Sequence, residues 1–225
     1  MEKQIKISDY IKTGSLPTGK LNKITDVKGV RVGHSTIKNA ENYTGVTVIL
    51  PSENNIYTNK LEAAAYVLNG FGKSTGLVQI EELGLLEAPI ALTNTLNVGK
   101  VLDGMLDYVI DNLASDDVFC SINIPVLECN DSLINNIRKR AVETKHVYEA
   151  IENACENFEE GDVGAGTGAA SQRFPAAALE AAHAQRGAVD HVHEFGVHAL
   201  GEHGILLDHR THLVQRNAVH VQHEH

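Results

Sequence analysis

The sequence predicts a layered α/β domain of the α+β kind, and three observations support this fold class. Stretches typical of strands alternate with stretches typical of helices over the first 168 residues. Residues 44–50 are apolar and β-branched and end at Pro51, as expected for a buried strand. Residues 98–113 place apolar side chains at the 3.6-residue period of an amphipathic helix.

The elements before the amphipathic helix follow from local patterns. Residues 24–27 and 30–32 flank a glycine and predict a short pair of strands. Residues 60–68 are good helix formers followed by Asn-Gly, which predicts a helix. A further helix is expected over residues 78–83, closed by a glycine, and residues 89–93 form an apolar run of strand length.

Two elements are expected after the amphipathic helix. Residues 118–126 are a candidate for a buried strand, because the run is short and apolar. Residues 142–158 predict a second amphipathic helix. The alternation of strands and helices therefore continues to about residue 158.

Composition divides the chain near Gly168 and predicts two parts. All twelve lysines lie at or before Lys145, whereas ten of the twelve histidines lie at or after His183. Residues 1–168 have the composition of an ordinary enzyme domain, and residues 169–225 are rich in Ala, Val and His. Apolar residues in the second part follow no regular period of 2 or 3.6, so we expect an irregular His-rich tail.

Charge and cysteine content exclude several classes of protein. The formal net charge of −10 argues against nucleic acid or an anionic membrane as the main partner. Three cysteines without close spacing predict neither a disulfide framework nor a cysteine-based zinc site, and they fit a reducing compartment. Neither an apolar run of about 18 residues nor an apolar signal segment is found, so we expect a cytoplasmic protein.

Six motifs follow one another in the first part of the chain. They are ITDVKGVRVGH (24–34), TGVTVI (44–49), NGFGKSTG (69–76), PIALTNT (89–95), PVLECND (125–131) and GDVGAGTG (161–168). In this order and spacing they resemble the DmpA-like aminopeptidases, which include L-aminopeptidase/D-esterases and β-peptidyl aminopeptidases. The resemblance covers roughly residues 15–168.

The resemblance implies a fold and a chemistry. The fold is an αββα sandwich shared with ornithine acetyltransferases, of which residues 1–168 would be the N-terminal part. The chemistry is that of an N-terminal-nucleophile hydrolase: a precursor cuts itself before a serine, whose own α-amine then serves as the base. An Asn side chain stabilises the oxyanion. The implied substrate is a small peptide or an amino-acid amide, no cofactor is implied, and intact members form homo-oligomers.

Glu128 is the site residue that the resemblance transfers to this chain. In the family an acidic residue in the segment matching residues 125–131 holds the free ammonium group of the substrate, and Glu128 stands at that place. Its neighbours Val126 and Leu127 are apolar, so burial would strengthen its attraction to a cationic amine. The alternative is that Glu128 only caps or pairs locally. Some members carry Tyr two residues later, where this chain has Asn130.

The nucleophile segment of the family is not recognisable in this sequence. Ser171 is the only serine after Gly168, and its neighbours do not match the family pattern. Asn217 lies in a stretch that loosely resembles the oxyanion strand, but it lies too far along the chain. We therefore assign no catalytic residue and expect neither self-cleavage nor amidase activity from this chain alone. A frameshift, an assembly join or a fusion near residue 168 would explain the change in composition.

Nucleotide-binding and histidine-based sites are less well supported. Residues 161–168 are Gly-rich but lack the Gly-Lys-Ser/Thr of a phosphate loop, so close backbone packing is expected instead. Residues 72–74 do read Gly-Lys-Ser, but no glycine stands at residue 67, where that motif requires one. His34 and His146 are isolated in the sequence, and we expect structural roles for both.

The histidines of the tail support an alternative function, a non-enzymatic His-rich metal-binding protein. Their spacing suits Zn²⁺, Ni²⁺ or Cu²⁺ in three groups, His191 with His193, His209 with His212, and His220 with His223 and His225. His193-Glu194 and His198 miss the zincin spacing by one residue, so no catalytic metal site is assigned. A regulatory or assembly subunit built on the aminopeptidase shell is a third possibility.

Overall fold

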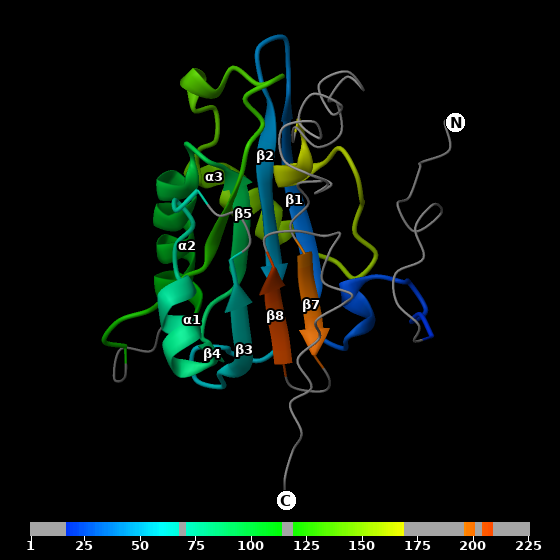
Figure 1. Cartoon of the computed structure of the whole chain (residues 1–225), viewed down its shortest axis with the longest axis vertical. Helices are drawn as coiled ribbons and strands as arrows, with labels where there is room; N and C mark the ends of the chain where they lie inside the picture. Colours follow the sequence, from blue (N-terminus) through cyan, green and yellow to red (C-terminus); the bar gives the residue numbers. More distant parts are fainter. Residues whose placement is uncertain (1–16, 68–70, 114–118, 169–195, 201–203, 209–225) are drawn as a thin grey trace, which may run out of the picture.

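The structure, a computed structural model, describes residues 17–67, 71–113, 119–168, 196–200 and 204–208, the last two ranges as backbone only. Within these residues the chain forms two four-stranded sheets and three α-helices (Figure 1). A short 3₁₀ helix, Ile24–Asp26, precedes the first strand. Further 3₁₀ turns lie at Ile137–Lys139 and Gly164–Gly166.

The first sheet has the strand order β1-β2-β5-β6. Its members are β1 (Arg31–Lys38), β2 (Tyr43–Leu50), β5 (Ile90–Asn94) and β6 (Val126–Cys129). β1 and β2 form an antiparallel hairpin, β5 is antiparallel to β2, and β6 is parallel to β5. Every residue of β2 except Tyr43 is buried, because other layers cover both faces of this central strand.

Helices α2 (Val98–Asn112) and α3 (Thr144–Glu152) cover one face of the first sheet. The apolar stripe of α2 provides fully buried side chains at Val101, Met105 and Val109. They pack in one core cluster with residues of β2, β5, β6 and α3. Burial of this stripe stabilises α2 and, through it, the strand ends where β5 and β6 finish.

The second sheet has the strand order β4-β3-β8-β7. Its members are β3 (Leu61–Tyr66), β4 (Leu85–Leu86), β7 (Gly196–Leu200) and β8 (Gly204–Asp208). β3 pairs antiparallel with β4 and parallel with β8, and β7 and β8 are antiparallel. Helix α1 (Leu77–Leu83) lies beside β3 and β4 (Figure 1).

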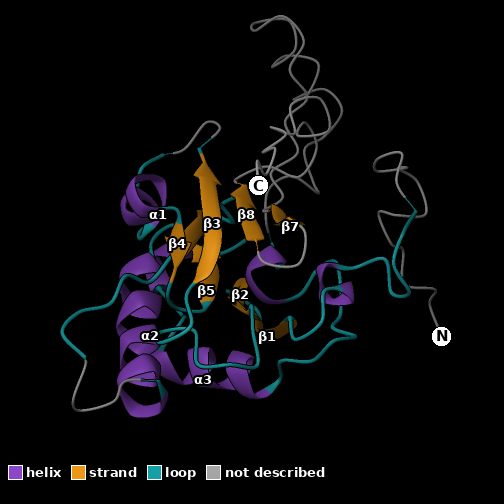
Figure 2. Cartoon of the chain, turned by 90° about the horizontal axis from the view of Figure 1, so that it is seen from below, coloured by secondary structure: helices purple, strands orange, loops and turns teal. Residues whose placement is uncertain are grey.

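The second sheet lies against the other face of the first. Figure 2 shows β1, β2 and β5 between α3 on one side and β3, β8 and β7 on the other. Leu61, Ala63 and Ala65 of β3 pack on the core cluster at this interface, while the alternate residues Glu62, Ala64 and Tyr66 are exposed. The described layers are therefore helix, sheet and sheet, which matches the expected α+β class and an incomplete αββα sandwich.

Most of the expected elements are confirmed, but three segments were assigned wrongly. Residues 60–68 were expected to be helical, yet Leu61–Tyr66 forms strand β3, because pairing with β4 and β8 outweighs the helix propensity of the alanines. Of residues 24–27, Ile24–Asp26 form a 3₁₀ helix rather than a strand, and Asp26 accepts hydrogen bonds from the backbone N–H of Leu21 and Lys23. The strand expected over 118–126 begins only at Val126.

The tail is not irregular throughout. β7 and β8 lie within residues 169–225, where no strands were expected, and β8 extends the second sheet by pairing with β3. The spacing of apolar residues did not predict β7 and β8. These short strands are defined by backbone pairing rather than by an alternating pattern. Ser171 and Asn217 lie outside the described residues. Among the residues that are described, no helix has the length and apolar character needed to cross a membrane.

Candidate active site

Polar side chains gather where the parallel strands β5 and β6 end. The register pairs Thr93 with Glu128 and Asn94 with Cys129, so the residues that follow both strands lie at the same edge of the sheet. In open parallel sheets the carboxyl ends of the strands are the usual place for ligand sites, and β5 and β6 form the parallel pair of this mixed sheet. The side chains at this edge are therefore the first candidates for binding and chemistry.

Glu128 is buried at this edge with its carboxylate held from two sides. The Glu128 side chain is 6% exposed. Its Oε1 accepts a hydrogen bond of 2.9 Å from the backbone N–H of Lys73, and its Oε2 accepts one of 2.6 Å from the hydroxyl of Thr95. A carboxylate offers about four lone-pair positions, so these two bonds leave acceptor capacity for a third donor.

The segment Phe71–Gly76 runs beside β6 and supplies the other contacts of Glu128. The backbone N–H of Thr75 donates to the carbonyl of Val126 at 3.0 Å, and the backbone N–H of Glu128 donates to Ser74 Oγ at 3.1 Å. Gly76 has a φ of +79°, and a Cβ there would lie 2.6 Å from the carbonyl oxygen of Ile124. Only glycine lets this segment approach β6 so closely, which explains one glycine of the NGFGKSTG motif.

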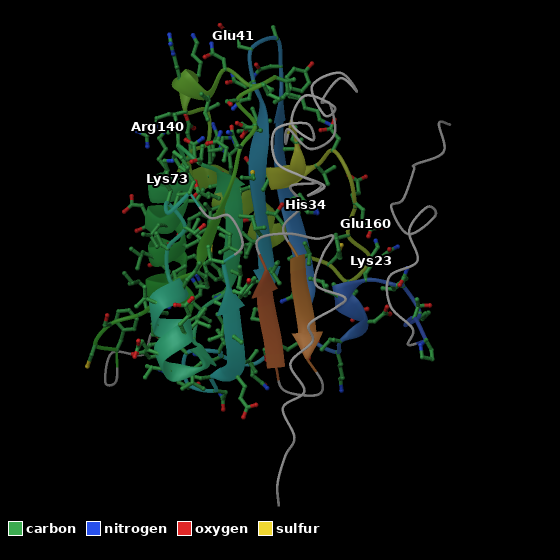
Figure 3. All side chains as sticks on the ribbon, viewed as in Figure 1. Lys23, His34, Glu41, Lys73, Arg140 and Glu160 are labelled. Atoms are coloured by element: carbon green, nitrogen blue, oxygen red, sulfur yellow. The ribbon has the colours of Figure 1, made fainter. Side chains whose placement is uncertain are left out.

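The ammonium group of Lys73 is the cation nearest to Glu128 among the described side chains. Its Nζ lies 3.9 Å from Glu128 Oε2 and 3.7 Å from the centroid of the Phe71 ring. The Lys73 side chain, labelled in Figure 3, is 35% exposed. At 3.9 Å the pair is an ion pair rather than a direct hydrogen bond.

Behind Glu128 a fully buried polar network fixes the strand ends. Asp131 accepts hydrogen bonds from the side-chain amides of Asn94 at 3.1 Å and Asn135 at 3.0 Å. Asn94 also donates to the hydroxyl of Thr44, and its Oδ1 accepts from both the backbone and the side chain of Asn97 at the start of α2. Burial raises the pKa of the Asp131 carboxyl, and the hydrogen bonds from Thr44, Asn135 and Asn94 oppose that rise.

Asp131 organises the site rather than lining it. Its exposed fraction is zero, and its partners lie on β2, on β5 and in the turn after β6. Asn130 accepts a local hydrogen bond from the backbone N–H of Ser132. Neither residue contacts the Glu128 carboxylate by a described hydrogen bond.

The other residues considered in the sequence take structural places. His34 lies between the hydroxyl of Thr47, at 2.9 Å from Nδ1, and the carbonyl of Glu159, at 3.0 Å from Nε2. His146 Nδ1 accepts a hydrogen bond from the backbone of Glu143 at the start of α3. These contacts agree with the structural roles expected for both histidines.

The Gly-rich segment 161–168 packs closely against β2 instead of forming a phosphate loop. The backbone N–H of Ala165 donates to the hydroxyl of Thr47, and a Cβ at Gly164 would lie 2.4 Å from that same oxygen. Close backbone approach, as expected from the sequence, is therefore the reason for glycine here.

Metal binding by the tail histidines falls outside what the structure describes. His198 is described only as backbone in β7, and the other histidines of the proposed pairs lie beyond the described ranges. Among the side chains that are described, no group of three or more His, Cys, Asp or Glu is placed to hold a metal ion.

Sequence reasoning proposed Glu128 but missed its contacts with Lys73, Ser74 and Thr95. It also missed Phe71, whose ring lies against the ammonium group of Lys73. Glu128 was expected either to bind an amine or only to pair locally. It does pair locally, and it still has acceptor capacity for an ammonium group. The signal for the partners was present in the motifs NGFGKSTG and PIALTNT, which were recognised as a set without roles for their members.

Comparison with known proteins finds one family and several relatives. The model of peptidase family S58 matches residues 22–178. The chain is 34% identical over 166 residues to the β-peptidyl aminopeptidase BapA of Sphingosinicella xenopeptidilytica, covering 69% of this chain and 41% of that protein.

Two solved structures are similar as well. The PH0078 protein of Pyrococcus horikoshii OT3 superimposes with a TM-score of 0.67 at 50% identity, covering 73% of this chain and 50% of that one. The L-aminopeptidase D-Ala-esterase/amidase of Ochrobactrum anthropi, described as a variant of the Ntn hydrolase fold, gives 0.62 at 32% identity, covering 69% and 46%. This chain thus spans half or less of the length of these relatives.

Proposed function

Because the chain belongs to peptidase family S58, we propose that it carries the amine-binding part of an aminopeptidase that hydrolyses N-terminal peptide or amide bonds. The observation that supports this role is the carboxylate of Glu128, which is buried, hydrogen-bonded by Lys73 and Thr95, and still has lone pairs to accept from an ammonium group. The substrate would be a small peptide or an amino-acid amide with a free N-terminus.

A fixed carboxylate suits this reaction for a geometric reason. An enzyme that removes one residue must place the scissile carbonyl at a set distance from the substrate's ammonium group. Glu128 is anchored through its backbone by Ser74 and through both carboxylate oxygens, so an ammonium bound to it would hold the next peptide bond in one position. Burial weakens competition from water and strengthens the charge attraction.

We assign the cleavage step itself to no residue of this chain. The expected serine nucleophile and oxyanion Asn are not recognised in the sequence. The expectation is that this chain binds amines without hydrolysing them. Release of nitroaniline from L-alanyl-p-nitroanilide, faster with the wild type than with a purified Glu128→Ala variant, would contradict it.

The amine-binding role can be tested without turnover. L-Alanine amide is titrated into the ¹⁵N-labelled full chain, with N-acetyl-L-alanine amide as the ligand that lacks an ammonium group. We expect the free amide alone to bind, and Glu128→Gln to weaken its binding at least about tenfold, since one charge-assisted contact is lost.

Glu87→Gln is the matched control variant. Glu87 is also a buried glutamate, paired with Lys60 and with the backbone N–H of Asn123, but it lies away from the end of β6. Its replacement should leave amide binding unchanged. Equal affinities of the wild type and Glu128→Gln would overturn the proposed role.

A further inference from the structure

The position beside Glu128 that would suit a substrate ammonium is already taken by the ammonium of Lys73. Its Nζ lies 3.7 Å from the centroid of the Phe71 ring and 3.9 Å from Glu128 Oε2. A carboxylate and an aromatic face both attract an ammonium ion. The lysine side chain therefore marks a cation subsite formed by Glu128 and Phe71.

We infer that Lys73 is a built-in competitor for the amine subsite, and that a substrate amine must displace its ammonium to bind between Glu128 and Phe71. This inference rests on the proposed function and extends it to two further residues. Phe71 provides an aromatic wall that favours a cation. A ligand amine binds only if it interacts with this subsite more strongly than the ammonium group of Lys73 does.

The geometry favours a displaceable contact. The Nζ–Oε2 distance of 3.9 Å is longer than a direct hydrogen bond, and about a third of the Lys73 side chain is exposed. Phe71 is 82% exposed as a residue, so solvent can reach this aromatic wall. The backbone N–H of Lys73, in contrast, bonds Glu128 Oε1 at 2.9 Å, so the main chain can hold the carboxylate while the side chain swings away.

A lysine is a close chemical equivalent of the ligand it would exclude. Its side chain ends in a primary ammonium, as does the free N-terminus of a peptide or an amino-acid amide. A tethered group of the same charge and donor set competes at high effective concentration. Ligands without a cation gain nothing at this position, so the lysine selects for amines that bind Glu128 more closely than it does.

The test is amide affinity in Lys73→Met, which keeps the backbone and much of the side-chain volume but removes the charge. L-Alanine amide and its N-acetyl derivative are titrated into the full-length wild type, Lys73→Met, Phe71→Leu/Lys73→Met and Glu128→Gln. Lys60→Met is the matched control, because Lys60 also pairs with a buried glutamate, Glu87, and lies 5.8 Å from the centroid of the Tyr57 ring. Thermal melts confirm that each variant is folded.

We expect Lys73→Met to bind the free amide about tenfold more tightly than the wild type, since an ion pair and a cation–π contact no longer compete. The double variant Phe71→Leu/Lys73→Met should bind the free amide several-fold more weakly than Lys73→Met does. Lys60→Met should bind it with the affinity of the wild type. If Lys73→Met gains nothing while Glu128→Gln loses binding, the proposed function stands and the competitor role is overturned. If no folded variant, Lys73→Met included, binds the amide, both are overturned.

Discussion

Thr95 donates its hydroxyl hydrogen to Glu128 Oε2 over 2.6 Å, and so joins the residue after β5 to the next-to-last residue of β6. The bond spans 33 residues of sequence. It depends on the parallel register of the two strands, which places Thr93 opposite Glu128. Thr95 is therefore a positioning residue for the carboxylate and not a group that would contact the substrate's reacting atoms.

Replacing Thr95 tests this positioning role. Thr95→Val keeps the shape and removes the hydroxyl, so Glu128 loses a charge-assisted bond, and we expect the free energy of unfolding in urea to fall by about 1.5–3 kcal/mol. Thr95→Ser should retain most of the wild-type free energy of unfolding. The exposed Thr58, whose hydroxyl bonds the nearby carbonyl of Asn55, gives the control Thr58→Val, with a change within about 0.5 kcal/mol. A Thr95→Val variant as stable as the control would contradict the role.

The strands and helices that the sequence predicted well are those whose own burial pattern is strong. β2 is buried along nearly its whole length, and α2 has an apolar stripe, so local pattern and tertiary environment agree. β3 was missed because Ala63, Ala64 and Ala65 are good helix formers. Its strand state depends on partners that are adjacent only in space, among them β8, which lies in the tail.

The candidate site divides in the same way. Glu128 could be proposed as the amine anchor because a family motif surrounds it within a few residues. Its contacts with Lys73 and Thr95 span 55 and 33 residues, and no local pattern contains them. The Gly-Lys-Ser of residues 72–74 was recognised within a family motif and compared with a phosphate loop, but its residues were given no role at Glu128. In the structure, Lys73 and Ser74 instead hold the Glu128 carboxylate and backbone.

His34 makes stability depend on pH. Burial lowers the pKa of the His34 imidazole, the charge of Lys23 lowers it further, and the backbone and charge of Glu159 partly oppose this. Figure 3 labels His34, Lys23 and Glu160, the residue that follows Glu159. His34 Nε2 faces the carbonyl of Glu159, which can only accept, so Nε2 carries the hydrogen of the neutral ring and Nδ1 accepts from the hydroxyl of Thr47.

The sign of this dependence follows from proton uptake. Below the ordinary pKa of histidine, about 6.5, the unfolded chain binds a proton at residue 34 that the folded chain resists. The stability that His34 contributes is therefore present at neutral pH and is lost as the pH falls from about 6.5 through the lower pKa of the folded state. We expect the melting temperature of the wild type to fall more between pH 7.5 and 5.5 than that of His34→Gln. Parallel curves for the two proteins would show that His34 is not responsible.

Gly33 is required where β1 meets α3. A Cβ at this position would lie 1.9 Å from the carbonyl oxygen of Ala150 and 2.6 Å from the backbone nitrogen of Ala154. These are backbone atoms, so relieving the clash would require a shift of the main chain. Gly33→Ala should therefore lower the free energy of unfolding by about 3 kcal/mol or more.

Gly99 provides the comparison for Gly33. It lies in the first turn of α2, and a methyl group added there would meet no described atom within 4 Å. Gly99→Ala should therefore be neutral or stabilising by up to about 1 kcal/mol. Urea unfolding of both variants measures the difference. Similar effects of the two substitutions would mean that β1 and α3 can separate at little cost.

The three cysteines should differ sharply in reactivity. Cys120 and Cys155 are exposed, whereas Cys129 is buried at the end of β6. The Cys129 thiol donates toward the carbonyls of Thr93, at 3.4 Å, and Ala165, at 3.1 Å. Burial raises the pKa of this thiol, and the nearby charges of Asp131 and Glu128 raise it further.

Alkylation kinetics test this environment, because only the thiolate reacts and only where reagent can reach it. With iodoacetamide at pH 8, we expect Cys120 and Cys155 to be modified in the folded protein and Cys129 only after guanidinium is added, as assigned by peptide mass spectrometry. Because Cys129 is adjacent to Glu128, its rate of labelling also reports how often the end of β6 opens. Labelling of Cys129 at the rate of the exposed thiols under native conditions would mean that the strand end carrying Glu128 is not closed, and the anchored carboxylate of the proposed amine site would lose its structural basis.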